Sequence, residues 1–356
     1  MPAVETDALV IGAGPAGLFQ VFQLGLQGIR CHVVDVLPQA GGQCAALYPD
    51  KPIYDIPALA CVSGLALTQR LLEQIKPFAP QFHFGHEVVG LMRCNDASES
   101  AQNAWTVSTR GADAAGPVFK ARTVFIAAGV GAFVPRTLKL EGEAGFDAQH
   151  LHTAAIGNLD PSNPIHSTSR FKNARCVVVG NEGLAVATAI TLAQSPVKGV
   201  SLVHRKDEFE ATEPELKTLA ALRENGQIQV VLGQPIGLDS QQLRVAKADD
   251  TEVTLPLDDL FVCLGLSPRL GPLTGWGLSM HKRQIRVDPA SMATNLEGIY
   301  AIGDINDYPG KRKLIVCAFH EATLAAFAAA ARVFPDQTVR LEYTTSSRLL
   351  QSRLGV

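Results

Sequence analysis

The feature that most constrains this chain is a glycine-rich turn near its N-terminus. Gly12, Gly14 and Gly17 follow the spacing G-x-G-x-x-G, between an apolar run at 7–11 that predicts a buried strand and an apolar segment at 18–26 that predicts a helix. The first glycine permits a sharp bend, the second lets the backbone approach a pyrophosphate, and the third lets helix and strand pack closely. The phosphates then meet the positive end of the helix. The turn therefore predicts a dinucleotide site.

Two acidic residues extend this prediction. Residues 31–35 are predicted to form the second strand, which ends at Asp35, a carboxylate placed to accept hydrogen bonds from ribose hydroxyls. Far downstream, residues 299–302 predict a strand that ends in Gly303 and Asp304, suited to ribityl or phosphate-linked hydroxyls at the carboxyl edge of a sheet. Asp304 as a simple helix N-cap is the alternative. The downstream segment favours FAD over NAD.

The chain repeats this unit. Residues 175–179 predict a strand, Gly180 a turn, 184–192 a helix and 200–203 a second strand. Where the first copy ends in Asp35, the second has His204, Arg205 and Lys206. Cations there attract a 2′-phosphate, so the second copy favours NADP over NAD. A solvated basic turn without a ligand is the alternative.

The repeat predicts an α/β protein with two Rossmann-like, three-layer dinucleotide-binding domains. Residues 123–129 predict the strand that closes the first unit, and residues 260–265 the strand that closes the second. The expected domains are a discontinuous FAD-binding domain at 1–134 and 284–356, and an NAD(P)-binding-like domain at 135–283.

Composition narrows the class of protein. The 356 residues are 47% hydrophobic and 18% charged, with a net charge of −3, so we expect a globular protein without nucleic-acid or membrane partners. The N-terminus enters a strand pattern directly, without the features of a signal peptide. Seven scattered cysteines without a CxxC pair indicate reduced thiols, and we expect a cytoplasmic protein.

Further strings resemble those of the thioredoxin-reductase-like flavoproteins, within the pyridine nucleotide-disulfide oxidoreductase superfamily. The nearest resemblance is to the ferredoxin/flavodoxin–NADP reductases of that type. The strings that carry it, spread over nearly the whole chain, are 42–44, 47–49, 53–55, 127–136, 276–278, 303–306, 308–311 and 344–347.

The resemblance implies a homodimer with one FAD per subunit and a C-terminal tail that reaches a flavin. It also implies NADPH as hydride donor and ferredoxin or flavodoxin as electron partner, with the flavin carrying the chemistry and no certain catalytic side chain. The FAD contacts implied on matching positions come from Ala16, Asp35, Gln43, Tyr48, Val88, Phe133, Asp304 and Thr345. Tyr48 is expected against the isoalloxazine and Tyr343 on its other face, with core packing as the alternative for each.

The missing cysteines separate this chain from the disulfide reductases it resembles. Thioredoxin reductases carry CxxC before the second glycine motif, where this chain has none, and glutathione-reductase-like enzymes need a second cysteine beside the position of Cys44. Without a dithiol relay the flavin must pass electrons directly to its partner. Disulfide reduction is therefore not expected.

The second copy departs from the family pattern at two positions. Glu182 stands where backbone should approach the pyrophosphate, and Glu210 replaces a cation in the basic motif. Two like charges about 4 Å apart repel by roughly 4 kcal/mol at an effective dielectric near 20. Three explanations stay open: a re-routed loop with NADPH still bound, NADH as cofactor, or a second domain that has lost nucleotide binding. The last would leave a regulatory FAD-binding protein or a flavoenzyme with another donor.

Two surface features complete the predictions. The basic string Lys311-Arg312-Lys313 is a candidate docking patch for an acidic ferredoxin, with a solvated turn as the alternative. His83 and His86 lack further ligands nearby in sequence, so no metal site is expected.

Overall fold

The computed structural model describes residues 3–94, 104–112, 114–142, 145–153 and 168–356. The chain divides into two units, Met1–Ala132 with Arg269–Val356, and Phe133–Pro268. The second unit ends at Pro268, whereas the sequence predicted that the second domain ends at residue 283. Residues 269–283 belong to the first unit because Leu273 and Leu278 are buried in its core and Met280 pairs with Ile285.

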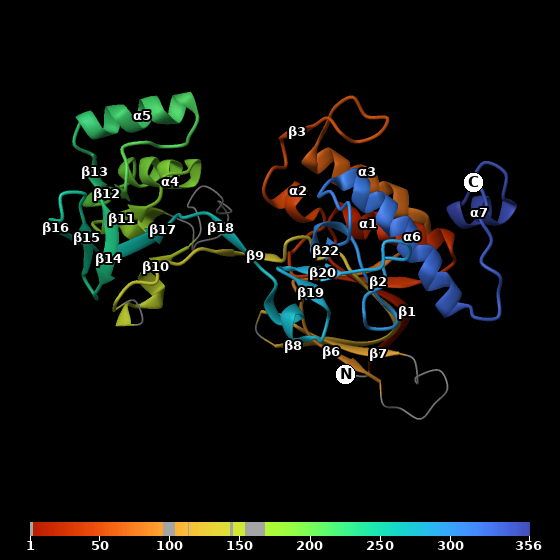
Figure 1. Ribbon diagram of the computed structural model, residues 1–356. Helices are drawn as coiled ribbons and strands as arrows, with labels where there is room; N and C mark the ends of the chain where they lie inside the picture. The colour runs from red at the N-terminus through yellow and green to blue at the C-terminus, as the bar shows by residue number, and fades with distance from the viewer. Residues whose placement is uncertain (1–2, 95–103, 113, 143–144, 154–167) are drawn as a thin grey trace. The chain divides into compact units, whose positions relative to one another are not determined.

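The first unit is built on a seven-stranded sheet in the order β5-β2-β1-β8-β7-β6, with β21 also paired to β8 (Figure 1). Strands β5, β2, β1, β8 and β21 run parallel, whereas β6, β7 and β8 pair antiparallel. The strands of this sheet are β1 (Val4–Ile11), β2 (Cys31–Asp35), β5 (Gln81–Phe84), β6 (Glu87–Arg93), β7 (Trp105–Arg110), β8 (Ala115–Ile126) and β21 (Ile299–Ala301).

Shorter elements complete the first unit. Its helices are α1 (Pro15–Leu26), α2 (Gly42–Ala46), α3 (Gly64–Ile75), α6 (Ile315–Val333) and α7 (Arg348–Leu354), with 3-10 turns η1 (Lys76–Phe78), η7 (Gly271–Gly275) and η8 (Gly303–Ile305). The two small sheets pair β3 (Pro52–Ile53) with β4 (Val62–Ser63), and β20 (Gln284–Arg286) with β19 (Met280–His281) and β22 (Asn306–Asp307).

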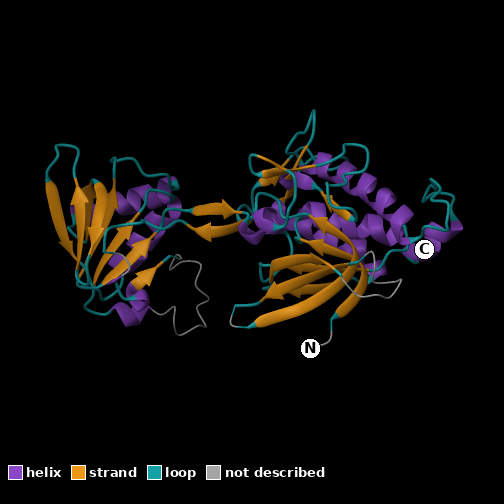
Figure 2. Ribbon diagram, turned by 60° about the horizontal axis from the view of Figure 1, so that its bottom comes forward, coloured by secondary structure: helices purple, strands orange, loops and turns teal. Residues whose placement is uncertain are grey.

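Alternating burial explains the layers of the first unit. Along β1, Ala8 and Val10 face the core beneath α1, α3 and α6, while Leu9 and Ile11 face the core formed with β6, β7 and η7. Because both faces of the sheet are covered here, the last four residues of β1 are all apolar. Figure 2 shows the helices gathered on one face of these strands.

Helix α6 packs against α1 through small side chains. Its alanines at 318, 322, 325, 326, 329 and 330 are buried, and Phe319 contacts Phe19 with 4.6 Å between ring centroids. Within the part of the chain that the structure describes, α6 is the one helix long and apolar enough to cross a membrane by length and composition. Since the buried alanines belong to the core of the first unit, we interpret α6 as a core helix.

The second unit repeats the three-layer plan. Five parallel strands lie in the order β10-β17-β11-β12-β13, with two helices on one face and an antiparallel sheet on the other. Its elements are β10 (Leu151–His152), β11 (Arg175–Val179), α4 (Gly183–Ala193), β12 (Gly199–His204), α5 (Glu213–Glu224), β13 (Ile228–Leu232), β14 (Gln234–Leu238), β15 (Gln242–Ala246), β16 (Glu252–Pro256) and β17 (Asp259–Val262). Strands β9 (Ala132–Pro135) and β18 (Leu266–Arg269), at the two chain crossings, pair with each other. The predicted fold class is confirmed.

Candidate functional site

The glycine turn between β1 and α1 is formed by very close backbone contacts. Gly12 has a φ of +108°, and a Cβ there would lie 2.4 Å from the Ala127 carbonyl oxygen. A Cβ on Gly17 would lie 1.9 Å from the Gly12 carbonyl oxygen. Both positions therefore exclude any side chain.

Gly14 is different, because a Cβ at this position would collide with no neighbouring atom. It caps α1 with an extended backbone and without a side-chain hydrogen bond, and a Cβ there would meet the Gly42 Cα at 3.8 Å. Helix α1 thus presents its first N–H groups to an accessible space. Such a helix end binds phosphate groups.

Asp35 lies beside this turn at the end of β2. Its Oδ2 accepts a hydrogen bond from Ala13 N at 2.6 Å and its Oδ1 accepts one from Leu37 N at 2.8 Å. Each oxygen retains a lone pair for a ribose hydroxyl. Burial raises the pKa of this carboxyl, and the two N–H donors act in the opposite direction.

The short helix α2 faces the same turn from the other side. A Cβ on Gly42 would lie 3.0 Å from the Gly14 Cα, so these two backbones nearly touch. The helix holds Gln43 beside Gly129, at the end of β8, and Cys44 Sγ 3.4 Å from the Tyr48 hydroxyl. Burial raises the pKa of both Cys44 and Tyr48, and the nearby charge of Asp304 adds to both shifts.

The downstream segment joins this cluster through η8. Gly303 has a φ of +77°, and a Cβ there would lie 3.1 Å from the Ala16 Cβ at the start of α1. Asp304 follows on the same turn and is half-buried; burial raises its pKa, and Lys311 and Lys313 oppose that rise. The structure thus brings the Gly12 turn, Asp35, α2 and Asp304 together at one edge of the sheet. Carboxylates around an open helix end fit a dinucleotide.

Glu321 on α6 holds η8 in place, and the sequence analysis missed it. The carboxylate is fully buried and accepts hydrogen bonds from Gly303 N at 2.7 Å, Asn306 Nδ2 at 2.9 Å and the Tyr308 hydroxyl at 3.0 Å. It also forms an ion pair with Lys311 Nζ, which is itself 6% exposed. An acidic residue inside an alanine-rich apolar helix was the signal that could have revealed it.

This ion pair corrects the predicted docking patch. Lys311 points into the protein and satisfies Glu321 and the Gly303 carbonyl, so it cannot contact a partner. Arg312 and Lys313 are exposed.

The remaining predicted FAD residues are not all near the Gly12 turn. Val88 is buried in β6, in the cluster that also holds Ile11 and Val34, and Phe133 lies on β9. Tyr343 and Thr345 lie in the exposed tail before α7. Arg353 of α7 donates a hydrogen bond to the Leu26 carbonyl, at the C-terminal end of α1.

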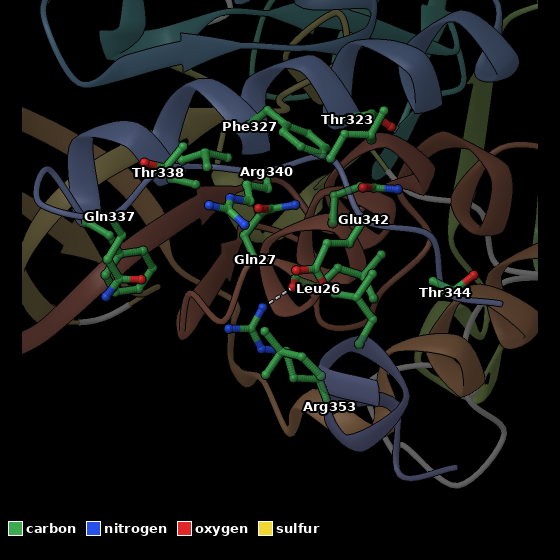
Figure 3. A pocket seen from close by; sticks show the side chains of 17 residues that line it. Leu26, Gln27, Thr323, Phe327, Gln337, Thr338, Arg340, Glu342, Thr344 and Arg353 are labelled. Carbon is green, nitrogen blue, oxygen red and sulfur yellow. Dashed lines mark hydrogen bonds between the residues drawn. The ribbon is translucent and has the colours of Figure 1, made fainter. Parts of the chain in front are cut away.

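The tail covers a cavity of about 300 Å³ at this end of α1 (Figure 3). Gln27 after α1, Phe327 of α6 and Glu342 of the tail are among its lining residues. Helix α1 has 12 residues, and at 1.5 Å per residue its two ends lie roughly 18 Å apart. The structure therefore does not bring the tail residues to the Gly12 turn of the same chain.

The second copy has the backbone of the first. Gly180 has a φ of +149°, and a Cβ there would lie 2.1 Å from the Cys263 carbonyl oxygen, which matches the contact between Gly12 and Ala127. Glu182 caps α4 with φ −76° and ψ 165°, close to the φ −73° and ψ −179° of Gly14. The backbone of the turn is therefore not re-routed, although Glu182 itself is exposed.

The basic residues of the second copy lie at the end of β12. His204 is half-buried and its Nδ1 lies 3.0 Å from the Lys206 carbonyl oxygen. Arg205 and Lys206 are exposed, and Lys206 Nζ lies 3.8 Å from Glu208. An exposed pair of this kind leaves both cations available to an anion.

Two histidines of the first unit, His32 and His83, pair with each other. His83 Nε2 lies 2.9 Å from His32 Nδ1, and burial lowers the pKa of both rings. His86 Nδ1 contacts the Phe84 carbonyl instead. Across the described ranges, no group of three or more His, Cys, Asp or Glu residues could hold a metal ion.

Comparison with known proteins places this chain in a family of dinucleotide-binding oxidoreductases. The model of the pyridine nucleotide-disulphide oxidoreductase family matches residues 6–322. A ferredoxin–NADP reductase of Paracidovorax citrulli is 47% identical over 99% of this chain and 97% of its own length. A ferredoxin–NADP reductase of Leptothrix cholodnii is 50% identical over 99% of this chain and 92% of its own length.

Solved structures share the fold at low identity. A thioredoxin reductase of Lactococcus lactis aligns with a TM-score of 0.55 and 21% identity, over 93% of this chain and 99% of its own. A bacillithiol disulfide reductase of Staphylococcus aureus aligns with a TM-score of 0.60 and 15% identity, over 92% and 99%.

The ion pair of Glu321 generates a prediction. Glu321→Gln should lower the free energy of unfolding by about 3–5 kcal/mol, because it leaves the buried Lys311 charge unpaired. It should also release η8, so that the purified protein retains less FAD. Urea denaturation and the ratio of flavin to protein absorbance measure the two effects.

Two further variants test the cause. Glu321→Met combined with Lys311→Met removes both charges and should recover most of the stability. Glu213→Gln, in the exposed pair with Lys217, should change stability by less than about 1 kcal/mol. Equal losses in Glu321→Gln and Glu213→Gln would contradict the assigned role.

Proposed function

Since the chain belongs to the pyridine nucleotide-disulphide oxidoreductase family, we propose that it is a ferredoxin–NADP reductase. It is a flavoprotein oxidoreductase that binds FAD in its first unit and transfers electrons between NADPH and ferredoxin. The relatives named ferredoxin–NADP reductase, 44–50% identical over nearly all of this chain, support this function and not a purely regulatory one. The observation that carries the proposal is the complete first site, with an open helix end at Gly14 between Asp35 and Asp304.

Different residues of the first site bind different parts of FAD. The N-terminus of α1 stabilises the pyrophosphate, and Asp35 accepts hydrogen bonds from the ribose. Asp304 orients the ribityl or phosphate-linked hydroxyls, and Gln43 and Tyr48 border the isoalloxazine. The bound flavin supplies the conversion of a hydride into single electrons, and the protein orients it and excludes water.

The cysteines support direct electron transfer to a protein partner. The sequence contains no CxxC pair, and the contact found for Cys44 is the Tyr48 hydroxyl. A dithiol relay would need a second sulfur close to Cys44. Ferredoxin or flavodoxin, in the cytoplasm, is therefore the partner we propose.

The reaction itself is directly testable. Anaerobic addition of NADPH should bleach the flavin of the purified holoprotein, and subsequent addition of ferredoxin should restore the oxidised spectrum. Dithionite serves as the control for a reducible flavin. A flavin that dithionite bleaches but millimolar NADPH does not would exclude NADPH as the donor.

We assign ferredoxin docking to Arg312 and Lys313, which follow the Asp304 turn on the surface. Long-range attraction to an acidic partner raises the rate of association. Arg312→Glu with Lys313→Glu should lower the association rate with ferredoxin by roughly tenfold at low ionic strength. Stopped-flow kinetics at two salt concentrations measure this effect, which salt should diminish.

A matched control places the same charge change elsewhere. Lys198→Glu with Lys247→Glu alters two exposed lysines of the second unit and should leave the association rate nearly unchanged. Equal effects of the two double variants would point to net charge rather than a docking patch.

We also propose that the protein is a homodimer in which each tail serves the flavin of the partner subunit. Leu341, Tyr343 and Leu349 are 67%, 65% and 53% exposed, which is unusual for large apolar side chains. Their tail lies at the end of α1 that is remote from the Gly12 turn. Tyr343 and Thr345 therefore act in the dimer.

Mixed dimers test this arrangement. One subunit carries Gly14→Glu and binds no FAD, while the other carries Tyr343→Ala and keeps its FAD. If the tail acts on the partner, the single flavin is covered by an intact tail and reacts like that of the wild type. If the tail acts on its own subunit, this dimer should match the homodimer of Tyr343→Ala.

A further inference from the structure

The two glycine turns differ in what their second position presents to a ligand. Gly14 and Glu182 have nearly the same backbone conformation and each begins a helix after a parallel strand. The equivalent Cβ direction therefore points to the same place in both copies. In the first copy a Cβ in that direction would make only a 3.8 Å contact with Gly42 Cα, and in the second the direction carries a glutamate side chain.

The carboxylate of Glu182 reaches across the carboxyl edge of the second sheet. A Cβ on Gly265 would lie 3.1 Å from Glu182 Oε2 and 3.3 Å from Oε1. Gly265 follows β17, the strand paired with β11, so the side chain spans the space between two neighbouring strand ends. In doubly wound sheets this crevice binds the pyrophosphate of a dinucleotide.

A second carboxylate belongs to the same turn. Glu210 N donates a 2.8 Å hydrogen bond to the Asn181 carbonyl, and Glu182 pairs with Glu210 in an isolated parallel bridge. The bridge connects the loop after β12 to the glycine turn. The N-cap of α4 is therefore Glu182, with the backbone of Glu210 paired beside it, whereas the equivalent N-cap of α1 is Gly14.

We infer that Glu182 determines the affinity for nicotinamide dinucleotides: its carboxylate occupies the pyrophosphate position and must be displaced when NADPH binds. This inference rests on the proposed function, because it concerns the second dinucleotide of the same reaction. The binding penalty applies to NADPH and NADH alike, since both carry the pyrophosphate. Arg205 and Lys206 then distinguish the two through the 2′-phosphate.

The size of the penalty follows from charge and exposure. A carboxylate about 4 Å from a phosphate weakens binding by up to a factor of about a thousand at an effective dielectric near 20. Glu182 is exposed, and salt screens exposed charges. We therefore expect Glu182→Gly to tighten the binding of NADP⁺ by about 10- to 100-fold.

Three variants of the holoprotein separate charge from bulk. Glu182→Gly removes both, Glu182→Gln removes the charge and keeps the bulk, and Glu224→Gln removes an exposed charge at the far end of α5. Calorimetric titration with NADP⁺ and with NAD⁺ should show the order Gly tighter than Gln, and Gln tighter than wild type. Glu224→Gln should match the wild type, and FAD content should stay constant in all three.

The comparison of two cofactors gives the decisive result. Glu182→Gly should raise the affinities for NADP⁺ and NAD⁺ by the same factor. Arg205→Ala with Lys206→Ala should lower the affinity for NADP⁺ selectively. Adding Glu210→Arg to Glu182→Gly should tighten NADP⁺ further. Unchanged or weaker binding of both cofactors by folded Glu182→Gly would overturn the inference.

The reciprocal change checks the equivalence of the two turns. Gly14→Glu places the same side chain in the first copy and should yield folded protein that lacks FAD, with an unchanged affinity for NADP⁺. FAD retained in Gly14→Glu would also contradict the inference. Failure of the proposed function would give a different result from failure of this inference. Ferredoxin would then stay oxidised even when Glu182→Gly binds NADPH tightly.

Discussion

Both dinucleotide-type units depend on close backbone contacts where a strand, a helix and a neighbouring strand meet at a glycine. In the first unit, Gly12 and Gly17 bring β1, α1 and the end of β8 so close that any Cβ would collide with a carbonyl oxygen. This contact aims the first N–H groups of α1 at one edge of the sheet. Everything that binds a dinucleotide is then arranged around that edge. In the second unit, Gly180 makes the equivalent contact with Cys263.

A second constraint fixes the distant half of the first site. The segment 303–311 is contiguous with α6 in sequence, but it reaches the Gly12 turn because Glu321 accepts hydrogen bonds from Gly303 N, Asn306 and Tyr308 and pairs with Lys311. A buried ion pair of this kind gains little net stability compared with apolar packing, and strongly penalises loss of one partner. Its value here is geometric, because it holds Asp304 beside Cys44 and Tyr48.

Local sequence patterns explain why the two Rossmann units and part of the first site were predictable from the sequence. The apolar runs, the glycine spacing and Asp35 specify both Rossmann units, because each depends on residues fewer than about thirty positions apart. The apolar sequence around Glu321 was a signal of a buried carboxylate, but no local pattern identified Lys311 as its partner. The boundary predicted at 283 differs from the division at Pro268, because the burial of Leu273 and Leu278 in the first unit depends on contacts that are distant in sequence. The tail motif predicted contact with a flavin but not its distance from the Gly12 turn.

The two copies of one unit suit two different kinds of ligand. A prosthetic group that stays bound through every turnover gains from an open helix end and buried carboxylates, and the first copy provides both. A substrate that must leave after each hydride transfer gains nothing from equally tight binding, because binding beyond its working concentration does not accelerate the reaction. A carboxylate at the position of Gly14 is a minimal way to weaken one copy while its fold is kept, since Glu182 adopts the same backbone conformation. At the second position of the two glycine turns, the two copies therefore differ by one side chain on a shared backbone conformation.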